Sequence, residues 1–285
     1  MSRLGLAVHR FRPDALEVAG RVIGWASANG YEVVADESDL ASLRSTSVTS
    51  GDVGDVDVLV SIGGDGTMLR SVHVLNGRVV PLIGVNLGQL GYLAVVEDDE
   101  VIEALDIWHN GKEGSDYHYD DRMLLEVSMW AKGARLTNHL AMNEVVIEKS
   151  EAGHTVRLGV DIDKASFTTY AADGLILATP TGSTAYSMSA RGPILSPRLR
   201  AILMTPVSPH MLFDRSMVLD PQELVRIEIL GHRSVNVATD GELVHTLRPG
   251  DVVEVRAAQE VARFVRFKEQ RFHQTLKSKF GLSDR

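Results

Sequence analysis

The 285-residue sequence predicts an α/β domain with a Rossmann-like parallel sheet, followed by an antiparallel all-β domain. In the N-terminal part, short aliphatic strands alternate with amphipathic helices, which is typical of a doubly wound parallel sheet. Beyond it, β-prone runs follow one another at short spacing between turn residues, which is typical of antiparallel sheets. We expect domains at residues 1–112 and 113–268, and residues 269–285 forming a helix that packs back on the α/β domain.

The elements of the first domain can be placed in order. Residues 4–8 and 31–35 are expected strands, and between them Pro13 and Asp14 begin a helix that ends at Asn29-Gly30. Residues 36–54 are rich in Ser, Asp, Gly and Thr and are expected to be a surface loop with room for one short helical turn. Further strands are expected at residues 57–62 and 79–85, and helices from Thr67 to about Leu75 and after the acidic residues 97–100.

The second domain is expected to consist almost entirely of strands. They fall at residues 123–130, 135–139, 144–148, 155–162, 166–170, 175–179, 225–230, 234–239, 252–256 and 261–267. Turn signals such as Lys132-Gly133 and Asp240-Gly241 separate several of them. A final helix is expected from Arg271 to Phe280, with Gly281 as its stop.

The most informative stretch is Gly63-Gly64-Asp65-Gly66, which follows a buried strand and precedes a helix. A lone Asp-Gly is usually a turn, but three glycines around one carboxylate at a strand end indicate a ligand site. The carboxyl ends of parallel strands are where open α/β sheets bind ligands, and helix N-termini favour phosphate. Residues 86–93 follow the next strand, so they are either a leucine-packed turn or a second wall of the same cleft.

Two stretches of the second domain also contain potential ligand groups. Residues 172–187 run from a strand into a loop of Ser and Thr residues, which suits either a ligand or a helix N-terminus. Tyr186 in this loop could stack on a base. Asn143-Glu144 pairs an amide with a carboxylate that could accept ribose hydroxyls, although the dipeptide alone says little.

Composition and missing motifs exclude several classes. The net charge of −9 gives no electrostatic support for binding nucleic acid or an anionic membrane, so a phosphorylated substrate would need local cations or a metal ion. The absence of cysteine excludes disulfides, thiolate zinc sites and a cysteine nucleophile. The sequence contains no Walker loop, nucleophile elbow, His-Glu-x-x-His or Gly-x-Gly-x-x-Gly motif. Without a signal peptide or a membrane-length apolar run, the protein is expected to be cytoplasmic.

Taken together, five motifs resemble the NAD kinase family over nearly the whole chain. The first, Gly63-Gly64-Asp65-Gly66-Thr67, is also shared with diacylglycerol-type lipid kinases and related to phosphofructokinases. The others are residues 86–93, Asn143-Glu144, Asp173-Gly174 with residues 179–187, and residues 208–212 with Arg215. The resemblance implies phosphorylation of the adenosine ribose 2′-hydroxyl of NAD by ATP, or by polyphosphate in some bacteria, with Mg²⁺ or Mn²⁺.

The resemblance also implies roles for individual residues. Asp65 would be the general base on the hydroxyl, and Gly66 would let the nucleotide approach. The NAD-binding residues would be Gly66, Asn143, Glu144, His154, Asp173, Thr184, Ala185, Tyr186 and Ser189. The ATP phosphates would contact Gly63, Gly64, Thr67 and Arg70, and the metal would be held mainly through the nucleotide rather than by direct protein ligands. The family implies a homodimer or homotetramer.

Three positions depart from the family pattern. Arg191 stands where the family usually has glycine, Ser216 replaces a proline, and Glu242 replaces a glutamine. Two alternatives remain, a non-catalytic NAD(P)-binding regulator and a lipid-type kinase. Retention of Asp65 argues against the first, since a sensor needs no base, and the block at residues 179–187 argues against the second.

Overall fold

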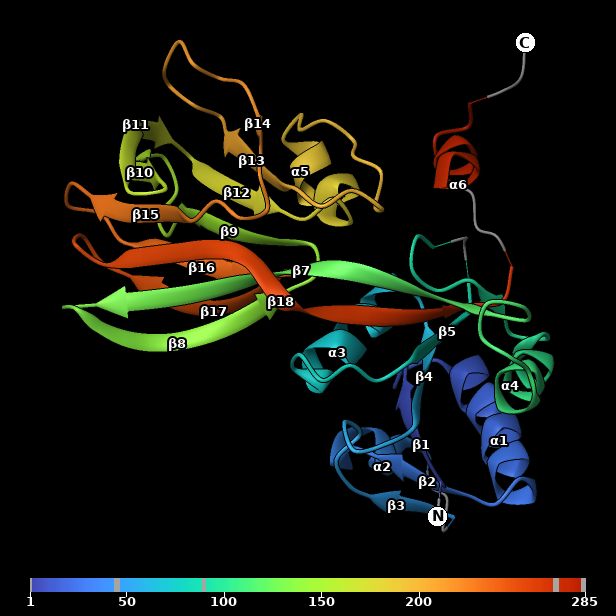
Figure 1. The fold of residues 1–285 in the computed structure, drawn as a ribbon. Coiled ribbons are helices and arrows are strands. Elements are labelled where there is room, and N and C mark those ends of the chain that lie inside the picture. Colours follow the sequence, from blue (N-terminus) through green and yellow to red (C-terminus); the bar gives the residue numbers. More distant parts are fainter. Residues whose placement is uncertain (1, 44–46, 89–90, 269–271, 283–285) are drawn as a thin grey trace. The chain divides into compact units, whose positions relative to one another are not determined.

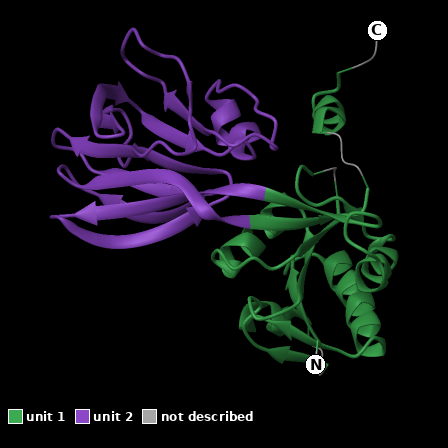
Figure 2. Cartoon of the chain, in the orientation of Figure 1, with its two compact units in different colours: residues 1–121, 262–285 green, residues 122–261 purple. Residues whose placement is uncertain are grey.

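The computed structural model describes residues 2–43, 47–88, 91–268 and 272–282 (Figure 1). The chain forms two compact units (Figure 2), one from the described residues of 1–121 and 262–285 and the other from residues 122–261. Each unit has its own hydrophobic core. Among the described residues, no helix combines the length and apolar character needed to cross a membrane.

The first unit contains a parallel sheet in the order β5-β4-β1-β2-β3. Its strands are β1 (Ser2–Val8), β2 (Tyr31–Ala35), β3 (Val48–Ser50), β4 (Val58–Gly63) and β5 (Leu82–Asn86), and the short β6 (Val96–Glu97) pairs with β5. Strand β1 lies in the middle, because Leu4 is paired with Val33 on one side and with Val58 on the other. The predicted parallel α/β sheet is confirmed.

Helices cover both faces of this sheet. Figure 1 shows α1 (Pro13–Ala28) and α4 (Val101–Asn110) on one side and α3 (Asp65–Leu75) on the other. The apolar stripe of α1, which includes Val18 and Val22, packs with Leu105 of α4 against the strands. Near the C-terminus, α6 (Phe272–Lys279) contacts the ring of Tyr92 through Phe272 and Lys279. Arg271, where this helix was expected to begin, lies outside the described residues.

Residues 36–54 are more regular than the predicted loop with one short helical turn. Of the described residues in this range, 37–43 form the two-turn helix α2 (Glu37–Leu43) and 48–50 form strand β3, which pairs in parallel with β2. The carboxylate of Asp36 accepts the N–H of Asp39 at 2.7 Å, which caps the helix, and Leu40 and Leu43 pack on the core. The polar composition gives little sign of this helix, because only two leucines, Leu40 and Leu43, anchor its seven residues to the core.

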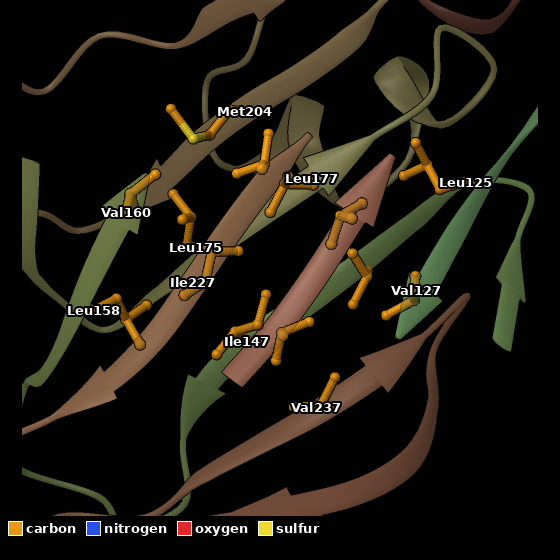
Figure 3. Packing of buried hydrophobic residues seen from close by; sticks show 14 of the residues in the cluster. Leu125, Val127, Ile147, Leu158, Val160, Leu175, Leu177, Met204, Ile227 and Val237 are labelled. Carbon is orange, nitrogen blue, oxygen red and sulfur yellow. The ribbon is translucent and has the colours of Figure 1, made fainter. Parts of the chain in front are cut away.

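The second unit is an antiparallel β structure, as the sequence predicts. One sheet has the order β14-β13-β12-β9-β16-β17 and the other runs β11-β10-β15-β18, while β7 and β8 form a hairpin. The strands are β7 (His118–Ala131), β8 (Ala134–Ala141), β9 (Glu144–Lys149), β10 (Val156–Ile162), β11 (Ala165–Ala172), β12 (Gly174–Ala178), β13 (Ile202–Val207), β14 (Met217–Leu219), β15 (Val225–Leu230), β16 (Val235–Thr239), β17 (Glu242–Leu247) and β18 (Val252–Arg266). Figure 3 shows their aliphatic side chains meeting in the core, for example Leu175, Leu177 and Ile147 beside Leu158 and Ile227.

Several strand boundaries differ from the sequence expectations. The expected strands at 252–256 and 261–267 are one 15-residue strand, β18, because pairing carries the chain through the weakly β-prone residues 257–260. Strands β13, β14 and β17 were missed altogether. In the first unit, β5 begins at Leu82 rather than Val79, directly after Pro81, which has no N–H to donate to a sheet ladder.

Candidate active site

The Asp65 side chain lies at the carboxyl edge of the parallel sheet, where β4 ends at Gly63 and α3 begins. Its Oδ2 accepts the N–H of Tyr92 at 2.9 Å, and its Oδ1 accepts those of Leu93 at 3.0 Å and Ala94 at 3.4 Å. These donors belong to the loop after β5, the parallel neighbour of β4. The structure therefore brings the second glycine-rich motif into contact with Asp65, although its residues Gln89 and Leu90 lie outside the described part.

Two further features fix the position of this loop, a close approach at Gly91 and a hydrogen bond from Arg266. A Cβ on Gly91 would lie 2.2 Å from Asp65 Oδ1, so only glycine leaves room for the carboxylate there. Arg266, 2 % exposed at the end of β18, donates from Nη1 to the carbonyl of Leu93 at 2.8 Å. Sequence reasoning missed Arg266, because nothing in its local pattern points to a loop 173 residues earlier in the chain.

Glycine occupies the positions around Asp65 for different structural reasons. At Gly63 a Cβ would lie 2.3 Å from Thr67 Oγ1, so this glycine permits close packing of the buried Thr67. At Gly64 and Gly66, the position of a Cβ has no atom of the described residues within 4 Å apart from the adjoining residues and the backbone of the same helix. Gly64 has a φ of −120°, which any residue can adopt. Neither packing nor a left-handed backbone requires glycine at these two positions, and their missing side chains leave open space beside Asp65.

Arg70, the predicted phosphate-binding cation, is engaged in a network beneath this edge. Its guanidinium pairs with both carboxylate oxygens of Asp39, at 3.0 and 2.9 Å, and donates to the carbonyl of Val8 at 2.7 Å. Asp39 is 1 % exposed and also accepts Arg10 Nε at 2.9 Å. The Arg70 side chain is 27 % exposed, so it stabilises α2 and β1 while still reaching the surface. Asp39 falls in the segment that the sequence indicated as a loop.

In the second unit, Asn143 and Glu144 sit in a turn that distant segments hold. The carboxylate of Asp240 accepts the N–H groups of Met142, Asn143 and Glu144 at 2.8, 2.6 and 3.0 Å. Thr179 donates from its hydroxyl to the carbonyl of Met142 at 2.6 Å and from its N–H to that of Asn143 at 2.8 Å. A Cβ on Gly182 would lie 2.0 Å from the Asn143 oxygen, which explains that glycine. Asp240 and Thr179 thus position the Asn-Glu pair.

The Glu144 carboxyl group is buried and incompletely bonded. The residue is 5 % exposed, and its carboxylate accepts the backbone N–H of Tyr186. Its Oε2 has no hydrogen-bond partner among the described residues. Burial, and next the nearby carboxylate of Asp240, raise the pKa of Glu144 to about 7. A buried, unpaired carboxyl oxygen costs stability, so the site suits a ligand hydroxyl that would donate to it.

Tyr186 lies near this carboxyl group, whereas Asp173 lies beside the far end of β9, where Gly174 pairs with Glu148. Burial raises the pKa of Tyr186, and the carboxylates of Glu148, Asp173 and Glu144 raise it further. Asp173 accepts a hydrogen bond from Lys149 Nζ at 2.7 Å. Lys149 was not singled out from the sequence, because an exposed-looking lysine at a strand end gives no signal of its own.

The remaining predicted NAD-binding residues differ in their surroundings. Thr184 ends the short 3₁₀ turn η1 (Gly182–Thr184), Ala185 follows it, and Ser189 is exposed at the end of α5 (Tyr186–Ser189). They therefore share one loop with Tyr186. His154 is exposed in the loop before β10, and the described contacts do not connect it with Glu144 or Asp173.

The three departures from the family pattern also lie in this unit. Arg191 has a φ of +66°, the left-handed conformation that favours glycine. Ser216 accepts from Thr205 Oγ1 at 3.1 Å, and Thr205 in turn lies 3.1 Å from Ser187 Oγ, so the serine adds a link to a hydroxyl network under α5. Glu242 is exposed at the start of β17.

Comparisons with known proteins cover most of the chain. The profile of the ATP-NAD kinase N-terminal domain matches residues 4–112, and that of the ATP-NAD kinase C-terminal domain matches residues 142–267. The NAD kinase of Syntrophotalea carbinolica is 36% identical over 289 residues, covering 100% of both chains. The NAD kinase of Heliobacterium modesticaldum is 36% identical over 282 residues, covering 98% of each chain.

Solved structures agree with these matches. The chain superposes on yeast NADH kinase complexed with NADH with a TM-score of 0.90 and 27% identity, covering 100% of this chain and 89% of the other. It also matches an NAD kinase from Archaeoglobus fulgidus in complex with ATP, with a TM-score of 0.72 and 21% identity over 98% and 97% of the two chains. The second likeness concerns the fold alone.

Proposed function

The chain belongs to the ATP-NAD kinase family and is an NAD kinase, and from this premise we propose how its residues divide the work of phosphoryl transfer. The acceptor is the 2′-hydroxyl of the adenosine ribose of NAD, and the donor is ATP or inorganic polyphosphate. With ATP, the new bond joins the 2′-oxygen to the γ-phosphorus, the bond between the γ-phosphorus and the bridging oxygen breaks, and ADP leaves with that oxygen. A divalent cation, held mainly through the nucleotide, would offset phosphate charge during the transfer.

We propose that Glu144 and Asn143 hold the ribose. The unpaired, buried Oε2 of Glu144 is the observation that carries this assignment, because a ribose hydroxyl would supply the missing donor. The amide of Asn143 can accept or donate beside it. Asp173, Thr184, Ala185, Tyr186 and Ser189 would contact the rest of NAD, with Asp173 at the carboxamide, and His154 would lie at its periphery.

We propose Asp65 as the general base. Its carboxylate is fixed by the backbone N–H groups of Tyr92 and Leu93, so a hydroxyl can meet it in one orientation. The open space at Gly64 and Gly66 would admit the donor phosphates beside it, with Gly63, Thr67 and Arg70 completing that side. As the hydroxyl oxygen attacks, Asp65 takes its proton, and no charged alkoxide has to form in water.

The assignment is tested by NADP⁺ formation from NAD⁺, ATP and Mg²⁺, read through a coupled NADP-specific dehydrogenase. Asp65→Asn should lower kcat by about 10²-fold or more, because the amide cannot accept the proton. The matched control is Asp57→Asn, which alters a carboxylate that also accepts a backbone N–H, from Arg3 at 2.7 Å, at the opposite end of β4. An unaffected Asp65→Asn enzyme would remove the general-base role and keep the activity. A folded wild type that binds NADPH without any turnover would instead indicate a regulator.

We also propose a homo-oligomer, dimer or tetramer, in keeping with the family resemblance. Sedimentation at micromolar protein should show an assembly larger than one chain, and a fully active monomer would contradict it. A cytoplasmic location and dependence on Mg²⁺ or Mn²⁺ remain predictions of the same kind. Activity should disappear with excess chelator and return with either cation.

A further inference from the structure

The loop between β1 and α1, residues 9–12, lies at the point of the sheet where ligands are expected. The order β5-β4-β1-β2-β3 means that the chain leaves β1 toward β2 on one side and later adds β4 on the other (Figure 1). In such open sheets the crevice outside the carboxyl ends of these two central strands is the ligand site. The loop touches the glycine-rich turn there, since a Cβ on Gly63 would lie 3.3 Å from His9 Cβ.

Arg12 extends across this crevice. Its Nη1 lies 3.5 Å from the position of a Cβ on Gly88, which belongs to the loop after β5. Because β4 lies between β1 and β5, a side chain that reaches from the first loop to the third passes over the carboxyl end of β4, where Gly63 and Asp65 are. The Asp14 carboxylate accepts hydrogen bonds from Nε, at 3.0 Å, and from Nη2. This fork orients the guanidinium and leaves Nη1 without a hydrogen bond to the described residues.

Arg12 is thus better placed than Arg70 to meet a phosphate. Arg70 is bound on two sides by the buried Asp39 carboxylate and donates to the carbonyl of Val8. Among the described residues, the partner of Arg12 is the exposed Asp14, and the Arg12 side chain is 41 % exposed. A phosphate at Gly64 would meet an oriented cation that loses little hydration and breaks no buried ion pair.

Phe11 adds a second recognition element to the same loop. The side chain is 90 % exposed, and its ring meets that of His9 edge-on, with 6.5 Å between centroids and 80° between planes. An edge contact of this kind leaves the ring faces uncovered. Aromatic faces next to a phosphate-binding cation are how proteins hold nucleotide bases, by stacking.

We propose that Arg12 and Phe11 bind the phosphoryl donor, with Arg12 Nη1 on a phosphate oxygen and the Phe11 ring stacked on the base. This inference rests on the proposed NAD kinase reaction and sharpens it. Because inorganic polyphosphate has no base, the donor that fits this loop is a nucleoside triphosphate. Phe11 is the residue that discriminates between the two donor classes.

The test compares ATP with inorganic tripolyphosphate in steady-state assays of wild type, Phe11→Ala and Arg12→Gln. Phe11→Ala should raise KM for ATP about 10-fold, the size of one lost base stack, without changing KM for NAD⁺. Arg12→Gln should raise KM for ATP as much or more and also weaken any use of tripolyphosphate. The matched controls lie at the opposite edge of the sheet: Val79→Ala removes another exposed apolar side chain, and Arg78→Gln breaks the Arg78–Asp52 pair. Both controls should leave KM for ATP within about twofold of wild type.

Each outcome decides the proposal. If Phe11→Ala keeps the wild-type KM for ATP, or if wild type uses tripolyphosphate as well as ATP, base recognition by Phe11 is wrong. If Arg12→Gln keeps KM for both donors, the phosphate contact is wrong. If wild type is inactive with both ATP and tripolyphosphate, the proposed kinase reaction is wrong. Calorimetric titration with the Mg²⁺ complex of a non-hydrolysable ATP analogue then tests nucleotide binding by the loop alone. In that case, weaker binding of the analogue by Phe11→Ala and Arg12→Gln than by Val79→Ala and Arg78→Gln supports the proposal. Equal binding by all four variants overturns it.

Discussion

Asp65 in the first unit and Asp240 in the second use the same device in opposite ways. Each carboxylate accepts backbone N–H groups from successive residues, at positions 92–94 and 142–144 respectively. Asp65 is itself the proposed base, so the amides position the reacting group. Asp240 shapes a turn and helps to raise the pKa of the neighbouring Glu144, which is the group proposed to touch substrate. A carboxylate that accepts several backbone N–H groups therefore does not reveal its role by its hydrogen bonds. The space beside the carboxylate distinguishes the two roles.

The largest expected effect comes from removing the Asp240 carboxylate, which holds the Asn-Glu turn. Asp240→Ala leaves three backbone donors without their acceptor, which should lower the free energy of unfolding by about 3 kcal/mol or more in urea titrations. Asp251→Ala is the control, because its carboxylate accepts a single exposed N–H, from Arg248. If Asp240→Ala costs no more stability than this control, the clamp is not what holds the Asn-Glu turn.

A second change tests whether Asp65 depends on exact placement. In Gly91→Ala, the new methyl group would displace the Asp65 carboxylate, because a Cβ there falls 2.2 Å from Oδ1. We expect kcat to fall about 10-fold or more with little loss of stability, since a displaced base loses its alignment with the hydroxyl. Stopped-flow or steady-state rates with a thermal melt would separate the two effects, and an unchanged kcat would mean that the carboxylate position is not critical.

The pH dependence of NAD binding should test the proposed contact between Glu144 and the ribose. With its pKa raised to about 7, Glu144 is protonated in the free protein below that pH, and a ribose hydroxyl donates better to the ionised form. KM for NAD⁺ should therefore rise several-fold as the pH falls from about 8 to about 6. Glu144→Gln should bind NAD⁺ more weakly at the upper end and flatten the profile. A wild-type KM that does not vary over this range would contradict the assignment.

The smallest expected effect concerns Arg191, whose left-handed backbone sits near the proposed NAD loop. Arg191→Gly should stabilise the protein by about 1 kcal/mol, because glycine adopts this conformation without steric cost. Thermal or urea unfolding would measure the gain. If KM for NAD⁺ also changes, the arginine contacts the substrate as well as straining the chain.

The sequence predicts best what is local. The Asp65 turn follows from a strand, three glycines and a helix start within a dozen residues. The Asp240 clamp does not, because its partners lie 96 to 98 residues away and no local pattern marks an aspartate as theirs. The polar composition of α2 gives no helix signal, and the weakly β-prone residues 257–260 lie within strand β18, which pairs with β15 and β7. The sequence predicts that the glycines of the first motif are functional, whereas only the structure shows that Gly63 permits the packing of Thr67 and that Gly66 leaves open space.

The bond from Arg266 to the loop that holds Asp65 has a consequence for the order of assembly during synthesis. Leu93 donates its N–H to Asp65 and receives Arg266 at its carbonyl, so this residue links the N-terminal third of the chain to a residue near the C-terminus. The contact with Arg266 spans 173 residues, and such non-local contacts close late. A ribosome that has finished the first 121 residues has made the glycine-rich turn but not the strand that completes its support. We expect the nascent chain to acquire a fully ordered Asp65 only after residue 266 has emerged, so that premature termination yields no competing half-active enzyme.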